Sequence, residues 1–380
     1  MTFRDGAAAR GGIGFWRKLF RFNWGLTILV AAVAAVGFLM LYSVAGGDVD
    51  PWASRQMMRF GVGVGVMVIV AMIDLSFWRL LSPLVYIGAL ALLVGVELAG
   101  VSGMGATRWI DLGFFRLQPS ELMKIGLILA LARYYDWLSP ERTSSVLWLA
   151  PPLILIALPV MFVLRQPDLG TAILLAAGGL GVMFLAGVSW WFFTLGALGA
   201  GGAVATVLMS RGTEWQLLKD YQFRRIEVFL DPSQDPLGAG YHITQSKIAL
   251  GSGGLSGRGF MEGTQSRLNF LPEKHTDFIF TTLAEEFGFL GGVSLLGLYA
   301  LIILVCFLSM ASSTSRFGGL LTGGVALTFF LFLAVNISMV LGLAPIVGVP
   351  LPLVSYGGSA MLVLLFGFGL AQSAHIHRKG

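Results

Sequence analysis

Charged residues are scarce in this sequence of 380 residues, and cysteine is almost absent. Asp, Glu, Lys and Arg make up 12% of the chain, whereas a soluble domain carries roughly a quarter. This shortage, together with 56% hydrophobic residues, excludes an ordinary soluble protein and indicates a membrane protein. The single cysteine, Cys306, lies inside an apolar run. A disulfide framework is therefore excluded, and loops outside the membrane must hold their shape by packing and hydrogen bonds.

Several functional motifs are missing as well. No Walker loop, dinucleotide fingerprint or GxSxG elbow occurs in a suitable context, so a nucleotide is not expected to supply energy. His242 and His275 have no cysteine or histidine between them, a spacing that does not suit zinc. The net charge of +5 does not indicate nucleic acid, because the basic residues do not cluster on a soluble domain.

Ten apolar segments are long enough, or nearly long enough, to cross a bilayer as helices. We therefore expect an all-α polytopic membrane protein with about ten transmembrane helices, forming a single domain over residues 24–374. The expected spans are 24–45, 58–74, 81–99, 120–136, 146–164, 170–187, 190–210, 283–310, 318–341 and 355–374.

The distribution of basic residues predicts the orientation of this bundle. Residues 1–23 form a basic N-terminus and residues 375–380 a basic C-terminus, and the first apolar stretch is too long for a signal peptide. The loops on the same side as the termini carry Arg79, Arg133, Arg142 and Arg316 with almost no acid. By the positive-inside rule, both termini are expected in the cytoplasm.

The segment from Arg211 to Thr276 interrupts a protein whose other loops are mostly short. It falls on the extracytoplasmic side, between the seventh and eighth expected spans, and such long loops commonly carry function. Its many glycines permit close backbone approach to a ligand. Tyr241–Leu250 is expected to form a short amphipathic helix at the membrane surface. A site for a lipid headgroup fits this layout.

A second extracytoplasmic loop, Gly100–Pro119, mixes cations with an aromatic residue that suits the membrane interface. Its candidate ligand-binding residues are Arg108, Trp109, Arg116 and Gln118. Ser120 is expected to cap the helix that follows, with Pro119 directly before it.

Charged residues also lie at the ends of predicted spans, where an unpaired charge is costly. Glu121 and Lys124 are three positions apart on one helix, and we expect them either to pair or to contact a ligand. Arg165 and Asp168 flank a proline turn, and pairing with neighbours is favoured over phosphate binding. The apolar loop Pro345–Pro352, which leads to Ser355, is expected to serve packing.

Asp277 lies where the long loop re-enters the membrane, in the sequence LPEKHTDFIF that ends at Phe280. One interpretation is that Thr276 or Asp277 caps the next helix. The other is a carboxylate whose pKa is raised by the apolar residues after it and lowered by Lys274, and such a group suits general-base catalysis. The residues by themselves leave both interpretations open.

Five segments together resemble the SEDS family of shape, elongation, division and sporulation proteins, and its RodA branch more than its FtsW branch. They are RWIDLGFFRLQPSELMKIG from Arg108, RQPDLGTA from Arg165, FLDPSQDPLGAGYHITQSKIALGSGGLSGRG from Phe229, GTQSRLNFLPEKHTDFIFTTLAEEFGFLGG from Gly263, and VGVPLPLVSYGGSA from Val347. They span most of the chain in the family's order. Thr281 and Thr282 replace an alanine-containing sequence expected after DFIF, which is a conservative change.

The resemblance implies a peptidoglycan glycosyltransferase of the bacterial inner membrane that polymerises lipid II during cell elongation and releases polyprenyl pyrophosphate. It implies that Asp277, the aspartate of HTDF, is the essential residue. Cations near the outer face would then stabilise the pyrophosphate, and the candidates are Arg108, Arg116, Lys247, Arg258 and Lys274, with Glu273 in a supporting role. A divalent cation, Mg²⁺ or Mn²⁺, is implied as a cofactor bound mainly through the substrate.

The resemblance also implies a class B penicillin-binding protein, a transpeptidase, as partner. Two other functions stay open at this point. A lipid II flippase would need a polar cavity and intramembrane charge, and Glu285 and Glu286 in the eighth span would suit such a carrier. A non-catalytic scaffold for the transpeptidase would leave Asp277 and the arginines without a role.

Overall fold

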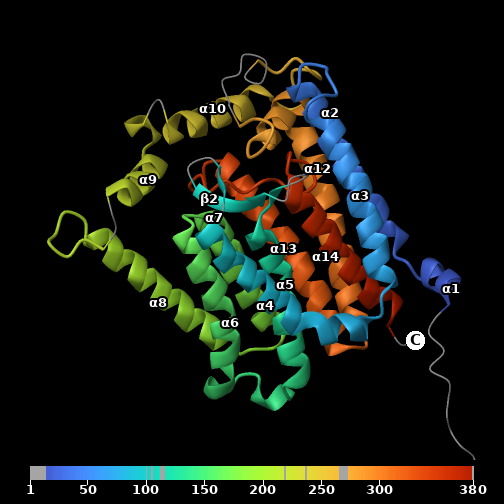
Figure 1. Ribbon diagram of the computed structural model, residues 1–380. Helices are drawn as coiled ribbons and strands as arrows, with labels where there is room; N and C mark the ends of the chain where they lie inside the picture. Colours follow the sequence, from blue (N-terminus) through green and yellow to red (C-terminus); the bar gives the residue numbers. More distant parts are fainter. Residues whose placement is uncertain are drawn as a thin grey trace, which may run out of the picture.

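Helices running up and down one bundle make up most of the protein (Figure 1). The computed structural model describes residues 14–99, 101–103, 106–111, 116–217, 220–235, 238–264 and 273–378. The helices are α1 (Phe15–Phe20), α2 (Trp24–Val44), α3 (Ala53–Met72), α4 (Leu75–Ala99), α5 (Pro119–Trp137), α6 (Val146–Arg165), α7 (Leu169–Leu185), α8 (Trp190–Met209), α9 (Asp220–Leu230), α10 (Ala239–Ser252), α12 (Ile279–Ala311), α13 (Arg316–Val340) and α14 (Gly358–Ile376). The strands are β1 (Val101–Gly103), β2 (Ala106–Asp111) and β3 (Arg116–Leu117), and Pro140–Arg142 and Pro232–Gln234 form short 3₁₀ turns.

The helices α2 to α8 and α12 to α14 occupy the ten expected spans, which confirms the all-α polytopic fold. Within the described residues, eight helices are long and apolar enough to cross a membrane. The other two are α7, which has 17 residues, and α5, whose 19 residues include Glu121, Lys124, Arg133 and Asp136. Charge is tolerated in α5 because α4, α6, α7, α13 and α14 pack around it.

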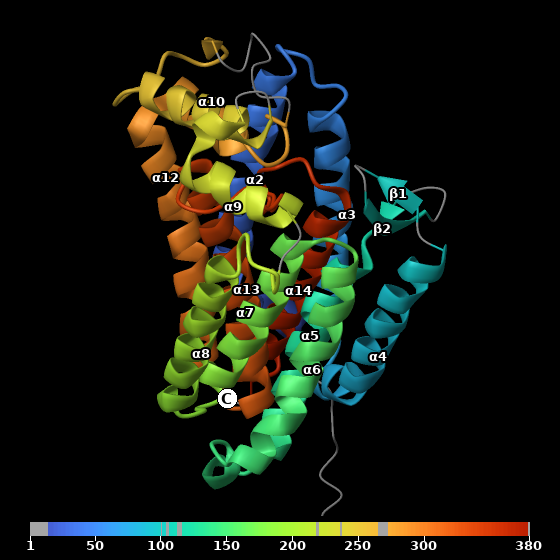
Figure 2. The ribbon, with the colours of Figure 1, turned by 90° about the vertical axis from the view of Figure 1, so that its left-hand side faces the viewer.

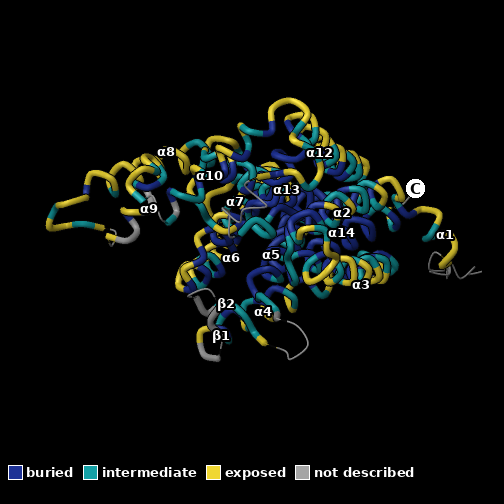
Figure 3. The backbone as a smooth tube through the Cα atoms, turned by 90° about the horizontal axis from the view of Figure 1, so that it is seen from above, coloured by how far each residue is buried: buried dark blue, intermediate teal, exposed yellow. Residues whose placement is uncertain are grey.

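Burial separates a central group of helices from a peripheral one. Buried residues are concentrated in α5, α13 and α14, which lie in the middle when the bundle is seen from above (Figure 3). By contrast, α8 lies at the edge and has no buried residue. An apolar helix with this exposure faces lipid in a membrane.

In the long segment between α8 and α12, α10 lies over one end of the bundle against α12, whereas α9 lies to the side, between α8 and α10 (Figure 1 and Figure 2). The expected helix at Tyr241–Leu250 is present as α10, whereas α9 was not predicted. The loop before α5 forms an antiparallel sheet of order β1-β2-β3, in which Val101 lies opposite Trp109 and Asp111 opposite Arg116. Helix α1 and the last turn of α14 lie toward the other end of the bundle (Figure 1).

A break in α12 fastens the long segment to the bundle. Gly288 has φ 66° and ψ −163°, which interrupts the helix and leaves backbone groups without helical partners. The amides of Arg258 and Gly259 donate to the carbonyls of Glu285 and Glu286 (3.0 and 3.1 Å). The broken turn therefore holds the chain that follows α10.

Candidate active site

Asp277 belongs to a tight turn that directly precedes α12. The amides of Thr276 and Phe278 donate to the carbonyl of Glu273 (3.2 and 3.3 Å), and the Thr276 hydroxyl donates to the Glu273 carboxylate (2.8 Å). Phe278 occupies the N-cap position of α12, and no side chain caps this helix. The capping interpretation of Thr276 or Asp277 is therefore wrong, and the Asp277 carboxylate has no structural task in starting the helix.

Asn336, on α13, fixes the backbone at Asp277. Its side-chain amide donates to the carbonyl of Asp277 (2.9 Å) and to that of Val349 (2.7 Å). Asn336 is fully buried, where each unmet polar group would be costly. A single side chain thus joins the turn before α12 to the loop between α13 and α14.

The loop between α13 and α14 holds the two residues before Asp277. The Ser355 hydroxyl donates to the carbonyl of Thr276 (2.5 Å) and accepts from the amide of Leu351 (2.8 Å). The amide of Tyr356 donates to the carbonyl of His275 (2.9 Å). Ser355 therefore fixes the backbone at the candidate site, rather than only shaping its own loop by packing.

Helix α3 supports the same turn from another side. The side-chain amide of Gln56, which is fully buried, donates to the carbonyl of Ser355 (2.8 Å). The ring of Trp52 stacks on that of His275, with centroids 4.7 Å apart and planes 16° apart. Burial lowers the pKa of His275, which favours its neutral form.

The Asp277 carboxylate is largely buried beside a glycine. A Cβ atom at Gly348, which has φ +68°, would lie 3.6 Å from Oδ2 of Asp277. Burial, and to a smaller extent the charge of Glu273, raise the pKa of Asp277 to about 6. The apolar surroundings act as predicted, but the expected opposing effect of Lys274 is absent and Glu273 adds to the shift. Such a group is ionised at neutral pH and still basic enough to accept a proton.

Lys274, which follows Glu273 in the chain, is also partly buried. Burial lowers the pKa of Lys274, and this residue has an interaction partner in the protein. Its position three residues before Asp277 keeps it a candidate for contact with an anionic substrate.

A second group of charges joins α5, α7 and the small sheet. Lys124 and Glu121 form the expected ion pair (2.7 Å), and both are buried. Asp168 accepts from the amide of Thr171 (3.1 Å) as N-cap of α7 and lies 3.6 Å from Arg108 on β2. This network settles the local role of Asp168 as pairing with a neighbour.

Two other residues complete this network. Arg108 also donates to the carbonyls of Gln166 (3.1 Å) and Pro167 (2.5 Å), and Gln118 donates to Asp168 (3.3 Å). Several hydrogen-bond donors of Arg108 and Gln118 are therefore already bonded to the turn before α7. Arg165 forms no ion pair within the described residues and lies 5.9 Å from the ring of Phe162, so its expected pairing is wrong there.

The first turn of α7, which Asp168 caps, also packs against the loop beside Asp277. A Cβ atom at Gly170 would lie 2.5 Å from the carbonyl oxygen of Val347, so only glycine fits without displacement. Val347 precedes Gly348, which borders the Asp277 carboxylate. The expected cap Ser120 is not used in this way, because α5 begins one residue earlier at Pro119, with Gln118 at the N-cap position.

The remaining predicted cations lie on the segment over the bundle and on the sheet. Lys247 is exposed on α10, and its Nζ would lie 2.9 Å from a Cβ atom at Gly342. Arg258 is exposed and donates to the Thr264 hydroxyl (2.8 Å). Trp109 is half-buried on β2, and the side chain of Arg116 lies outside the described residues.

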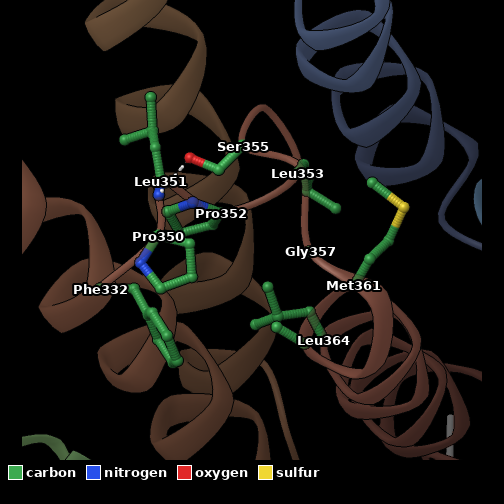
Figure 4. Close-up of a pocket in the computed structure, with 10 residues that line it drawn as sticks. Phe332, Pro350, Leu351, Pro352, Leu353, Ser355, Gly357, Met361 and Leu364 are labelled. Atoms are coloured by element: carbon green, nitrogen blue, oxygen red, sulfur yellow. Dashed lines mark hydrogen bonds between the residues drawn. The ribbon is translucent and has the colours of Figure 1, made fainter. Parts of the chain in front are cut away.

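The loop between α13 and α14 also closes a small cavity of about 10 Å³ (Figure 4). Pro350, Leu351, Pro352 and Phe332 line it, and the Ser355 hydroxyl points at the amide of Leu351. This volume holds about one water molecule. The cavity therefore belongs to the packing under the site and does not receive a substrate.

Sequence reasoning missed Asn336, Gln56 and Gly348. Asn336 lies within the apolar run LAVNISMV, and a polar residue at such a place signals an internal partner. Gln56 lies just before the expected start of the second span and carried no comparable signal. Gly348 was missed because its contact with the Asp277 carboxylate depends on how the loop after α13 folds, which the spacing of apolar residues does not predict.

Among the described residues no three His, Cys, Asp or Glu side chains are grouped to hold a metal ion. Asp277 and Glu273 nevertheless lie close enough for the charge of one to act on the other. Carboxylates with substrate phosphates are ligands that Mg²⁺ accepts. Glu273 therefore fits a cation whose other ligands come from a substrate, which leaves the Asp277 carboxylate free to accept a proton.

Asn336→Ala tests the support of the Asp277 turn. The variant leaves the buried carbonyl of Val349 and the partly buried carbonyl of Asp277 unpaired, and the loss at Val349 is expected to cost about 1–3 kcal/mol of unfolding free energy. Any activity that depends on Asp277 should fall as its backbone loosens. Thermal unfolding and activity of the purified variant check this. Thr328→Val, about two turns away on α13, is the control and should leave activity unchanged.

The bundle defines a polytopic helical membrane protein with a buried carboxylate in a turn at one end, whose backbone is held by hydrogen bonds. The family of cell cycle proteins FtsW, RodA and SpoVE matches residues 23–380, and the chain belongs to this family.

Relatives agree along nearly the whole chain. The peptidoglycan glycosyltransferase MrdB of Escherichia coli strain K12 is 44% identical over 368 residues, covering 96% of each chain. The probable peptidoglycan glycosyltransferase FtsW of Trichlorobacter lovleyi is 35% identical, covering 93% of this chain and 94% of the relative.

Solved structures agree with the fold. A structure from work on coordination of polymerization and crosslinking by a peptidoglycan synthase complex matches with a TM-score of 0.81 and 34% identity, covering 94% of this chain and 98% of that one. The rod shape determining protein RodA of Thermus thermophilus matches with a TM-score of 0.70 and 30% identity, with the same coverage.

Proposed function

We propose that this chain polymerises lipid II into glycan strands and that Asp277 is its general base. The chain is a peptidoglycan glycosyltransferase, as are the relatives that match it over nearly their full length. The observation that carries the assignment of the base is the Asp277 carboxylate, which is largely buried, has a raised pKa and takes no part in helix capping.

In the proposed reaction, a sugar hydroxyl of one lipid II molecule attacks the anomeric carbon of another. Asp277 accepts the hydroxyl proton as the new glycosidic bond forms, and polyprenyl pyrophosphate leaves with the electrons of the broken bond. A single displacement of this kind inverts the anomeric centre. The clamped backbone from His275 to Asp277 keeps the carboxylate in place, so little reorganisation is needed at the moment of reaction.

The cations around this end would act on the leaving pyrophosphate. Lys274 is the nearest of them along the chain, whereas Arg108 is partly engaged by the turn before α7. Lys247, Arg258 and Arg116 remain candidates. Mg²⁺ or Mn²⁺, bound mainly by substrate phosphates and on the protein side by Glu273, would supply charge neutralisation.

The proposed orientation places Asp277, α9 and α10 on the extracytoplasmic face of the bacterial inner membrane. Support comes from the basic loops at the opposite end of the bundle, where α1 and the end of α14 also lie. The proposed partner is a class B penicillin-binding protein, because a structural neighbour comes from a complex in which polymerization and crosslinking are coordinated.

Polymerisation by the purified full chain, alone and with its transpeptidase, tests this function directly. Fluorescent or radiolabelled lipid II should be converted into glycan strands that gel electrophoresis resolves. Absence of product under both conditions, together with lipid II transfer across vesicles, would favour the flippase instead.

The pH dependence provides a separate test of the base. Because the pKa of Asp277 is raised to about 6, the ionised, active form is lost as pH falls through that value. Polymerisation should therefore rise with pH and be half-maximal near pH 6. Glu273→Gln removes a charge that raises this pKa, so the midpoint should move to lower pH. A midpoint that does not respond to Glu273→Gln would contradict the assignment.

A further inference from the structure

The end of the bundle opposite Asp277 carries a second polar hollow, which we name the terminal hollow. It has a volume of about 550 Å³, within the range of small-ligand sites. Its lining residues are Phe20, Arg21, Phe22, Asn23, Trp24, His375 and Arg378. Residues from the two ends of the chain thus face the same space, and no carboxylate is among them.

Buried hydrogen bonds hold the two sides of the terminal hollow together. Gln372, fully buried on α14, accepts from the amide of Asn23 (3.0 Å) and donates to its carbonyl (2.9 Å). The Asn23 side chain in turn caps α2 by accepting from the amide of Leu26 (3.1 Å). The turn that carries Arg21 is therefore fixed against the helix that leads to Arg378.

The basic side chains are held from the α12 side as well. Arg378 donates to the Ser312 hydroxyl (3.1 Å), and His375 is within 3.0 Å of the Ser309 hydroxyl. Lys18 is engaged elsewhere, by the carbonyl of Met72 (2.6 Å), and is not counted among the cations of the hollow. Arg21, Arg378 and His375 thus line a hollow between the ends of α1, α2 and α14, and this set of donors suits an anion.

Exposed aromatic residues place this site at a bilayer surface. Phe20 is 86% exposed, Trp16 70% and Trp24 49%. A soluble protein rarely exposes such a group, whereas aromatic rings are enriched at the depth of lipid headgroups. Basic residues next to these rings would then lie at the level of the lipid phosphates.

We propose that the terminal hollow binds the phosphate headgroup of an anionic phospholipid. The arginines contact the phosphate, and the aromatic side chains lie against the upper part of the acyl chains. The site is separate from the catalytic turn, so its occupancy and polymerisation can be measured independently.

Native mass spectrometry of the full chain, with phosphatidylglycerol or phosphatidylcholine added to detergent, tests this. The wild type should retain phosphatidylglycerol in preference. A cation near an anionic lipid surface contributes about 1 kcal/mol, so Arg21→Gln with Arg378→Gln should weaken the binding of phosphatidylglycerol roughly 30-fold. The melting temperature in detergent should not change, because both residues lie at the surface.

Arg79→Gln with Arg142→Gln is the matched control. It removes the same charge from the same end of the bundle but outside the terminal hollow, and it should leave the preference intact. Equal loss in both double variants would show general charge attraction and overturn the proposal. Displacement of the lipid by millimolar inorganic phosphate would show a free-anion site and overturn it too.

Discussion

Asp277→Asn should abolish lipid II polymerisation, with a loss of at least about 100-fold expected for removal of a general base. Asparagine has nearly the same size as aspartate, but its amide cannot accept the hydroxyl proton at neutral pH. The backbone clamp uses the carbonyl of Asp277, which the variant keeps. The measurement is the initial rate of glycan formation by purified protein, with and without its transpeptidase.

The fold should survive this change. Burial raises the pKa of Asp277, which means that the surroundings disfavour its ionised form. A neutral amide removes this cost at neutral pH, so the melting temperature of Asp277→Asn should equal or exceed that of the wild type. A functional residue that weakens the fold is common at active sites. A lower melting temperature would indicate a structural role for the carboxylate.

Glu262→Gln is the matched control, because it removes an exposed carboxylate from the same segment. Its polymerisation rate should be that of the wild type. Full turnover by a well-folded Asp277→Asn variant would remove Asp277 as the base. If that variant were inactive in polymerisation but still moved lipid II across a vesicle membrane, transport and chemistry would be separable in one chain.

The helices were predictable because a chain that crosses a membrane can adopt few kinds of secondary structure. An apolar run of about 20 residues must be helical to satisfy its backbone, so the bounds of α2 or α8 follow from composition. The small sheet and α9 were missed, since mixed polarity in short segments carries no clear period. The break at Gly288 was missed for another reason: its partners, Arg258 and Gly259, come from a distant segment.

The site itself was predicted only in part. Asp277 stood out as a carboxylate at a membrane boundary, and the spacing of Glu121 and Lys124 gave their ion pair as one of two expectations. Asn336 and Gly348 act on Asp277 through contacts between α13, its following loop and the turn before α12. Such contacts depend on how helices are arranged around one another, which the spacing of residues along a single helix does not determine.

The buried pair on α5 gives the second large effect. Lys124→Met leaves the Glu121 carboxylate buried without its cation, and breaking such a pair is expected to cost about 3–5 kcal/mol of unfolding free energy. Methionine keeps the apolar stem of the side chain, which lies over the ring of Phe332 with Nζ at 4.0 Å from its centroid. Loss of stability would therefore come from the stranded charge rather than from a cavity.

The double variant Glu121→Gln with Lys124→Met tests whether the loss of stability comes from the unpaired charge of Glu121 or from the other contacts of Lys124. Removing both charges should restore most of the stability lost in Lys124→Met, because a neutral pair carries no desolvation cost. A double-mutant cycle of unfolding free energies measures the coupling. If the double variant unfolds as easily as Lys124→Met, the lysine stabilises the bundle through other contacts. If stability returns but polymerisation does not, the two charges have a functional role. They would then act either on the substrate directly or on Asp168, whose charge affects Lys124. Asp168 caps α7, and α7 contacts the loop beside Asp277.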